Sequence, residues 1–584
     1  MKKRTLYSLL MIGALSFSSC TDFLEKEPLD VLTDNADFWT NEASVETYAN
    51  AFYNQFSGYG NYGSTTGEMY YPHLHDNQAG SGFTNWNYTN APASNSNWSA
   101  TYDEIRRCNS MIVSLNEYAT GVMDPATLNH WLGVARLMRA YQYWDLVRKF
   151  GDAPYTEEVV DVNSPVLYAA RDDRDMIMDK VLDDLNFAVA NIQGGSQTTW
   201  SNDMAQAFKA RICLWEGTFR KYRVQGEGSK KGPDAAGAEK FLNACVDACN
   251  AIMGKYTLNM SDGGYQALYN SIDLAGNTEV IFYKRYIKDI FDHSLIAYTT
   301  ASTMQHGLTK DAFDAYLKLD GTEAGPGEDV GVWKQSAVDG GMHINLENIF
   351  ATRDKRMGWT LDPNLSYPGN GWMRVTGDAP MSSSTGYTFR IFDNTKEIDP
   401  VYRVNTSANY TCAPIFWISE VYLNYAEAKA ELGTLTQSDL NNTVNKLRER
   451  AGLPALTTTP ADMRDAYAQT KGTSALIFEI RRERRIELMP WSETRYWDLI
   501  RWHELDRLDT GKYPDVITGA NMTPDEGGAT LDLINGYIDA SNGMTRTYDP
   551  KHYLYPLPTT QFTLNPALEQ NPGWERTSVD EDEE

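Results

Sequence analysis

Long apolar runs are missing from this sequence beyond its first twenty residues. No later stretch approaches about 18 uncharged apolar residues, the length at which a segment becomes a candidate for a membrane-spanning helix. We therefore expect no transmembrane helix in the main body of the chain.

Cysteine is also scarce. The chain has 6 cysteines, one at position 20 and the others at Cys108, Cys213, Cys245, Cys249 and Cys412. They lack the paired spacing of a zinc site, and the odd number after position 20 does not suit a disulfide framework. Cys245 and Cys249 stand one helical turn apart among small and apolar residues in FLNACVDACNAI, which predicts buried thiols packed as small hydrophobic side chains.

Signatures of catalysis are missing as well. The sequence has no Gly-x-Ser-x-Gly elbow, and stretches such as GEGSKKG lack the strand-to-helix setting of a phosphate loop. His73 and His75 have no third histidine nearby, so we predict no metal site. With 78 acidic residues, carboxylate pairs for glycoside hydrolysis occur by chance. We expect no enzyme and no cofactor, and the sequence leaves bound Ca²⁺ open. A lipid-anchored glycoside hydrolase is the enzymatic alternative, and reducing-end release would favour it.

Basic residues are outnumbered. The chain has 52 Lys and Arg against 78 Asp and Glu, a formal net charge of −26 at pH 7. Such a surface repels phosphate backbones, which argues against nucleic acid as a partner. The stretch RRERRIELMPWSETRYWDLIRW is no exception, because seven arginines and six acidic residues lie between positions 481 and 507. Arg and Glu four residues apart support a helix, so we predict a salt-bridged helix and corner here.

The N-terminus carries the one apolar run of the chain. Three basic residues at positions 2–4 precede about a dozen apolar residues at 6–17, the pattern of a secretory signal. Ser18-Ser19-Cys20 follows and resembles a bacterial lipobox. We predict a lipoprotein signal peptide at 1–19, lipidation of Cys20 and a tether at 20–40. The alternative is ordinary cleavage near Ser19, which would leave Cys20 as a plain thiol.

Helical periodicity fills two parts of the chain, which we place at 41–255 and 415–584. Ile105, Cys108 and Ile112 illustrate the spacing of three and four residues. The predicted helices pair over about 34 to 40 residues, as in tetratricopeptide-like scaffolds. They lie in NEASVETYANAFYNQF, YDEIRRCNSMIVSLNEY, LNHWLGVARLMRAYQYWDLVRKFG, RDMIMDKVLDDLNFAVANI, NDMAQAFKARICLWEGTF, AEKFLNACVDACNAIM, FWISEVYLNYAEAKAELG, DLNNTVNKLRERAG and ALIFEIRRERRIEL.

Two segments lack this periodicity. Residues 57–97 form an aromatic, Gly-, Asn- and Ser-rich loop, and a loop of that length inside a compact domain is usually functional or disordered. Residues 256–414 are rich in Gly, Asn, Asp and aromatics, with short strand-like runs such as EVIFYKRY. We expect this middle part to be a loop-rich, ligand-binding region laid over the helices. The fold class is thus mainly α, with long irregular loops and a few short strands.

Six motifs in order point to a family. They are CTDFLE, WSATYDEIRRCNSMI, RLMRAYQYWDLVRKFGDAPY, the helix pair ISEVYLNYAEAKAELG and VNKLRERAGLP, IFEIRRERRIELMPWSETRYWDLIRW, and YLYPLPTTQFTLNPALEQNPGW. Together they resemble the SusD/RagB family of outer-membrane nutrient-binding lipoproteins of Bacteroidota, over almost the whole mature chain. Trp491 and Ser492 stand where the family more often has Phe-Glu-Gly, and Trp574 where Tyr is common.

The resemblance implies a tetratricopeptide-like scaffold and binding without catalysis, usually of an oligo- or polysaccharide. It implies a SusC-like TonB-dependent outer-membrane barrel as partner, over which the lipoprotein closes, and a lipid-anchored, surface-facing location. The RagB side of the family suggests peptide or protein uptake as the alternative.

Sugar binding calls for aromatic platforms and hydrogen-bonding side chains. The loop at 57–97 offers one candidate surface, and the middle region offers a second. The predicted ligand-binding residues are Trp86, Tyr88, Asp76, Asn77 and Asn90 in the loop, and Tyr283, Arg285, Trp333 and Trp372 in the middle region. Trp86 ranks first among these candidates. Trp98 is predicted to be a core residue under the loop.

Overall fold

The computed structural model describes residues 35–61, 67–68, 74–80, 86–300, 306–335, 340–367, 383–525 and 531–576. The predicted signal peptide, Cys20 and most of the predicted tether lie outside these residues. No helix in the described ranges combines the length and apolarity needed to cross a membrane.

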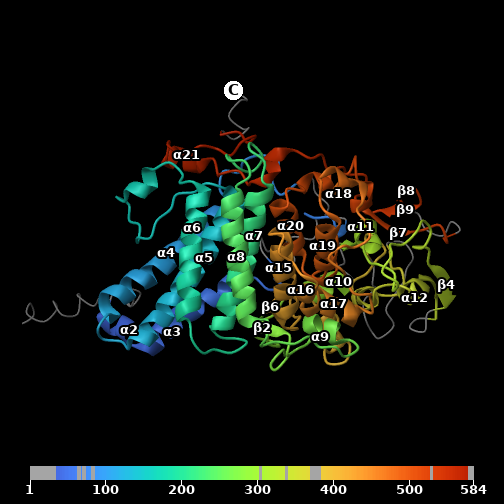
Figure 1. The fold of residues 1–584 in the computed structure, drawn as a ribbon, viewed down its shortest axis with the longest axis horizontal. Helices are drawn as coiled ribbons and strands as arrows, with labels where there is room; N and C mark the ends of the chain where they lie inside the picture. Colours follow the sequence, from blue (N-terminus) through green and yellow to red (C-terminus); the bar gives the residue numbers. More distant parts are fainter. Residues whose placement is uncertain are drawn as a thin grey trace, which may run out of the picture.

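The first half of the scaffold is a row of helices whose chain neighbours pack side by side (Figure 1). The row comprises α2 (Ala36–Thr40), α3 (Glu42–Asn50), α4 (Ser96–Ser114), α5 (Pro125–Phe150), α6 (Arg174–Asn191), α7 (Asn202–Tyr222) and α8 (Ala235–Ile252). The helices predicted here are confirmed. α5 ends at Gly151, whose φ of 72° favours glycine. Gly217 lets α7 and α8 approach closely, because a Cβ there would lie 2.7 Å from Leu242 Cγ.

A second helical group packs against this row. It comprises α15 (Ile418–Glu431), α16 (Gln437–Asn442), α17 (Val444–Ala451), α18 (Ala466–Thr470), α19 (Ala475–Glu487) and α20 (Ser492–Arg501). α15 contacts both α7 and α8, so the two groups share one interface (Figure 1). The predicted helices are again present, with two differences. Phe416 and Trp417 at the start of one predicted segment belong to a strand, and the helix predicted over DLNNTVNKLRERAG is divided into α16 and α17 at Thr443, whose backbone is not helical.

Short elements fill the middle and the C-terminal end. The short helices are α9 (Gly264–Asn270), α10 (Leu295–Thr300), α11 (Lys310–Asp314), α12 (Glu347–Phe350), α13 (Lys355–Thr360), α14 (Pro400–Val404) and α21 (Thr560–Leu564). Single helical turns lie at Ala51–Gln55, Leu115–Ala119, Pro165–Tyr168, Leu505–Leu508, Pro514–Val516 and Pro550–Tyr553.

Within the described residues, the strands form four small antiparallel sheets. β1 (Gln78–Gly80) pairs with β3 (His306–Leu308), β2 (Val280–Lys284) with β6 (Ala413–Trp417), and β4 (Val332–Gln335) with β5 (Met342–Asn345). The remaining sheet has the order β7 (Thr518–Asn521), β9 (Tyr537–Asp539), β8 (Leu533–Ile534). β2 confirms the strand-like reading of EVIFYKRY.

One large hydrophobic cluster runs through both helical groups, from Trp39 to Leu568. Trp98 is 5% exposed and belongs to it, as predicted. The five described cysteines are buried and free, which confirms the prediction that Cys245 and Cys249 are buried thiols.

The arginine-rich segment is an ion-paired helix and corner, as predicted. Arg484 donates to Asp498 at 2.8 Å, and Arg481 donates to Glu504 at 2.6 Å. Arg501 makes a bidentate pair with Glu427 of α15, at 2.5 and 2.8 Å. The arginines therefore hold α19 and α20 to each other and to α15.

Candidate ligand-binding surface

Backbone hydrogen bonds join the two predicted surfaces into one layer. β1, from the aromatic loop, pairs with β3. Leu308 of β3 donates to the Tyr387 carbonyl, and Ser366 donates to the Gly386 carbonyl. Leu365 in turn donates to Ile344 of β5, which pairs with β4. The layer thus runs from Gln78 to Trp333 through segments far apart in sequence; we call it the strand layer.

Close packing at Gly307 holds the strand layer together. A Cβ at Gly307 would lie 1.9 Å from Ser383 Oγ and 2.4 Å from Thr385 Oγ1. The Thr385 carbonyl accepts the Ala520 N–H at 2.7 Å, which attaches β7 to the same layer. Only a residue without a side chain fits between β3 and the 383–387 segment.

Buried charges anchor the aromatic loop beneath the layer. Asp76 is fully buried, and Arg495 donates to both of its carboxylate oxygens at 2.7 Å. Arg507 donates to the same carboxylate at 3.1 Å, and Arg485 lies 3.4 Å away. Arg485 also donates to the Asn77 side-chain oxygen at 2.7 Å. The structure therefore places Asp76 and Asn77 in the interior, and the arginines occupy their polar atoms.

The arginines around Asp76 and Asp311 keep both carboxyl groups charged although they are buried. Burial alone would raise the pKa of Asp76, but Arg485, Arg495 and Arg507 together hold its pKa well below the ordinary value. Asp311 lies in the same cluster, and Arg507 and Arg485 overcome burial to lower its pKa too. The anchor stays ionised at neutral pH.

Trp333 lies at the exposed end of the strand layer. It is 43% exposed, and its indole N–H donates to the Pro524 carbonyl at 2.6 Å. Tyr367 is 5% exposed and donates its hydroxyl to Asp525, the residue after Pro524, at 3.3 Å, so it supports the carboxylate from below rather than offering a free ring face. The 523–525 turn thus holds two aromatic side chains near a carboxylate, the combination that carbohydrate sites use. These residues and the strand layer form the candidate ligand-binding surface.

Trp86 and Tyr88 pack against the C-terminal segment instead. The Trp86 ring stacks on His552 with a centroid distance of 4.2 Å, and its indole N–H donates to the Thr547 carbonyl at 2.9 Å. The Tyr88 hydroxyl accepts from Asn95 at 2.9 Å. Asn90 is exposed beside them. Trp86 is the residue that the sequence analysis ranks first as a ligand contact. In the structure, its ring stacks within the protein and its indole N–H is already hydrogen-bonded.

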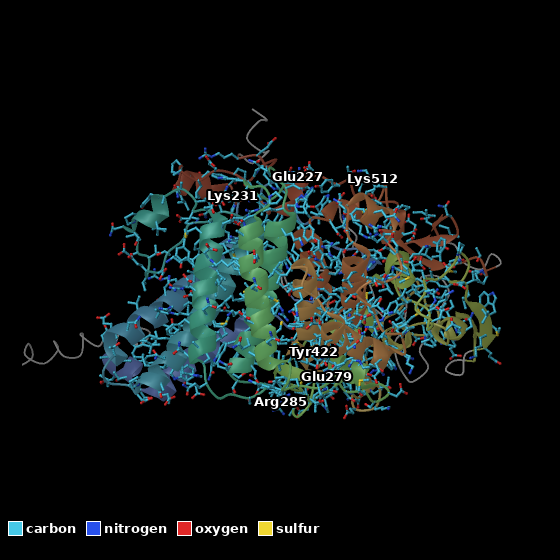
Figure 2. All side chains as sticks on the ribbon, viewed as in Figure 1. Glu227, Lys231, Glu279, Arg285, Tyr422 and Lys512 are labelled. Atoms are coloured by element: carbon cyan, nitrogen blue, oxygen red, sulfur yellow. The ribbon has the colours of Figure 1, made fainter. Side chains whose placement is uncertain are left out.

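The remaining middle-region candidates do not gather around Trp333. Tyr283 is buried in β2, where its hydroxyl donates to Asp273 at 3.1 Å. Arg285 is exposed at the lower edge of the molecule (Figure 2), whereas β4 with Trp333 lies at its right-hand side (Figure 1). Trp372 lies outside the described residues.

Sequence reasoning missed Tyr367 and Asp525 as members of the surface. Tyr367 directly precedes the Pro-Gly dipeptide in YPGNGW, so a local signal in the sequence was available. Asp525 had no such signal, because its partner is 158 positions away.

Comparison with known proteins identifies the family. Residues 277–574, or 298 of 584, match the sequence model of the SusD family. Residues 37–216 match a model described as "Starch-binding associating with outer membrane". Because the first match covers more than half of the chain, this protein belongs to the SusD family.

Individual SusD-like relatives match this chain at low sequence identity. A SusD-like protein of Formosa agariphila is 22% identical over 571 residues, covering 94% of this chain and 95% of the relative. A SusD-like protein of Bacteroides ovatus is 26% identical over 230 residues, which span 37% of this chain and only 40% of that relative.

Solved structures share the fold. A SusD-like carbohydrate binding protein from Bacteroides fragilis superposes with a TM-score of 0.65 at 20% identity, covering 91% of this chain and all of the other. A laminarin binding SusD-like protein gives a TM-score of 0.53 at 17% identity, covering 92% of this chain and all of the other. The mainly helical, tetratricopeptide-like fold is thereby confirmed.

Proposed function

We propose that this protein is a surface-exposed outer-membrane lipoprotein that binds an oligo- or polysaccharide without catalysis. It delivers this ligand to a SusC-like TonB-dependent barrel. Family membership supports the proposal, as do the names of the carbohydrate-binding and laminarin-binding structural neighbours. The Cys20 tether keeps the protein near a barrel in the same membrane at high effective concentration, so that a weak docking interface suffices.

The observation that carries the saccharide proposal is the exposed Trp333 beside the partly exposed Asp525, whose carboxylate is held by the buried Tyr367. An indole face can stack on the C–H face of a sugar, while a carboxylate accepts hydrogen bonds from its hydroxyls. The strand layer positions this set through backbone hydrogen bonds, so the surface is organised before ligand arrives.

Intrinsic tryptophan fluorescence titrated with a panel of polysaccharides and oligosaccharides tests this function. We expect a saturable change with one polymer class, and its loss in Trp333→Ala. Trp359→Ala is the matched control, because Trp359 is half-buried and its indole donates to Asp262, outside the strand layer. Trp86→Ala tests our first-ranked sequence candidate in the same assay.

Three outcomes decide against parts of the proposal. Saturable binding of peptides with no response to any saccharide would favour the peptide-uptake alternative. Saccharide binding that survives Trp333→Ala but not Trp86→Ala would move the site to the Trp86 side. Failure of the lipidated protein to co-purify with a barrel would overturn the delivery step.

A further inference from the structure

A large open groove lies along α4, away from the candidate ligand-binding surface. It encloses about 770 Å³. Its floor is one face of α4, including Trp98, Tyr102 and Ile105. One wall is the segment between Pro154 and Tyr168, and the other comes from α21 and the residues after it. Figure 1 shows these elements at the upper left, opposite β4. We call this feature the α4 groove.

The walls of the α4 groove present aliphatic and aromatic side chains to solvent. Val162, Leu167 and Tyr168 are exposed on one wall, and Leu564 is 67% exposed on the other. Exposed apolar side chains gathered on one feature mark interaction sites in soluble proteins. The groove is therefore built to be covered by another apolar surface.

The lining chemistry does not suit a sugar. The polar groups at the floor are already engaged, because the Tyr102 hydroxyl donates to the Pro154 carbonyl at 2.9 Å. The Asn109 amide donates to the Thr156 and Glu158 carbonyls at 3.1 Å. The walls carry the aliphatic side chains of Val160, Val162, Val166, Leu167, Leu564 and Leu568, and the exposed carboxylates lie at the rim rather than at the floor.

The rim of the groove is acidic. Asp103, Glu158 and Asp161 are exposed along it, and Arg106 is the basic residue among the groove's described lining residues. The Arg106 guanidinium donates to the Val160 carbonyl and is thereby held against the wall. Such a rim attracts cationic groups and repels anionic lipid headgroups.

The shape of the floor fits a helix. Trp98, Tyr102, Ile105 and Asn109 follow one another at helical spacing along α4, and the eleven rises from Trp98 to Asn109 extend about 16 Å at about 1.5 Å per residue. Tyr102 is partly exposed and the other three are buried, so a partner would contact the floor at Tyr102 and the exposed apolar residues of the walls on either side. A partner helix of about three turns can lie along this stripe between the two walls. Amphipathic helices bind grooves in this way through apolar side chains at positions i, i+4 and i+7.

We propose that the α4 groove binds an amphipathic helical segment of a partner protein, with aliphatic side chains on its buried face and lysine or arginine along its edges. The proposal is independent of the saccharide function, because the groove shares no lining residue with the Trp333 surface. Either can fail without the other.

Two synthetic peptides test the proposal. Both carry leucine at positions i, i+4, i+7 and i+11 of an amphipathic helix, one with lysine and the other with glutamate on the polar face. Binding to the purified full-length protein in detergent is followed by fluorescence anisotropy of labelled peptide. We expect saturable binding of the lysine peptide, and binding of the glutamate peptide that is weaker by at least about tenfold.

Variants locate the binding. Leu564→Asp and Leu167→Asp are expected to weaken binding of the lysine peptide by at least about tenfold, because each introduces a charge into the apolar contact. Val401→Asp is the matched control, since Val401 is 65% exposed and lies outside the groove. Asp103→Asn with Asp161→Asn is expected to reduce both the affinity and its dependence on salt.

Several results would overturn the proposal. These are no binding of the lysine peptide, equal binding of the glutamate peptide, and equal losses in Leu564→Asp and Val401→Asp. Recruitment of the protein to zwitterionic phosphatidylcholine vesicles that is lost in Leu564→Asp, without peptide binding, would assign the groove to lipid instead.

Discussion

Asp76 is the residue on which the position of the aromatic loop depends. Its carboxylate is fully buried, and the surrounding side chains of Arg485, Arg495 and Arg507 are only 7%, 9% and 13% exposed. Removing one partner from a buried ion pair costs about 3–5 kcal/mol, because the remaining charge stays buried without compensation.

Asp76→Asn should therefore lower the free energy of unfolding by about 3–5 kcal/mol, measured by urea denaturation at pH 7. Asp320→Asn is the control, because Asp320 is exposed and its carboxylate bonds only within its own turn. A change in the control within about 0.5 kcal/mol is expected. Equal stability of the two variants would show that the anchor contributes nothing.

Trp86 illustrates a second residue-scale effect, since it stacks on His552 and is half-buried. Trp86→Ala should destabilise the protein by about 2 kcal/mol through lost packing, seen as a lower melting temperature. Trp333→Ala, at an exposed position, should leave the melting temperature nearly unchanged. A larger drop in melting temperature for Trp333→Ala than for Trp86→Ala would contradict the assignment of Trp86 to packing and Trp333 to the surface.

At the scale of elements, the junction of β3 with the 383–387 segment depends on Gly307. Gly307→Ala would force its Cβ against Ser383, Thr385 and the Tyr387 carbonyl. We expect a loss of about 1–3 kcal/mol in unfolding free energy, since overpacking displaces the neighbours. Gly232→Ala serves as control, because nothing lies within 4 Å of its Cβ position. The rate of amide hydrogen exchange at β1 and β3 should rise in Gly307→Ala but not in Gly232→Ala. Unchanged exchange at β1 and β3 in Gly307→Ala would show that these strands do not depend on close packing at Gly307.

The contact between α15 and α20 predicts an acid-sensitive element. Burial alone would raise the pKa of Glu427, but Arg501, Arg484 and Arg481 lower it from 4.5 to about 2. A carboxyl whose folded pKa lies below its unfolded value stabilises the protein above the unfolded pKa. That stability is lost as pH falls from about 4.5 towards 2.

In Glu427→Gln, the free energy of unfolding should depend less on pH below about 4.5, and at pH 7 it should be lower by on the order of 3 kcal/mol. Urea denaturation between pH 7 and pH 3 measures both effects. Glu239→Gln, at an exposed position of α8, is the comparison. If the free energy of unfolding falls as steeply with decreasing pH in Glu427→Gln as in the parent protein, other groups cause that loss.

At the scale of the whole molecule, the two helical groups share one hydrophobic core and are joined by several ion pairs and hydrogen bonds. Arg211 of α7 makes a bidentate pair with Glu420 of α15 at 2.7 Å, and Arg148 of α5 donates to Glu493 of α20 at 3.0 Å. Arg501 also donates to Thr218 of α7 at 3.0 Å. Elements that share buried contacts of this kind open together.

Arg501→Lys should therefore destabilise both helical groups. Lysine cannot reproduce the guanidinium's contacts with Glu427, Asp498 and Thr218. Hydrogen exchange should show the same decrease in opening free energy at α7 and at α15. A decrease confined to α15 and α20 would indicate two units that unfold separately.

The sequence alone determined most of the helical scaffold. Periodicity is a local signal, so α4 to α8, α15 and α19 follow from the spacing of their own apolar residues. The burial of Cys245 and Cys249 was predictable for the same reason. The ion-paired arginine helix followed from the spacing of its charges, and the core position of Trp98 followed from the family motif that contains it. Family membership followed from several ordered motifs, each of which is local.

Only the tertiary structure decided which residues share a surface. Asp76 looked like a loop carboxylate because its arginine partners lie 409 to 431 positions away. The strand layer joins β1 to β3 across more than 200 residues, and no local pattern encodes that pairing. Trp86 and Trp333 both lie in segments without helical periodicity, and only the fold stacks one on His552 and leaves the other exposed. Residue chemistry can be read locally, whereas burial depends on what the rest of the chain brings alongside.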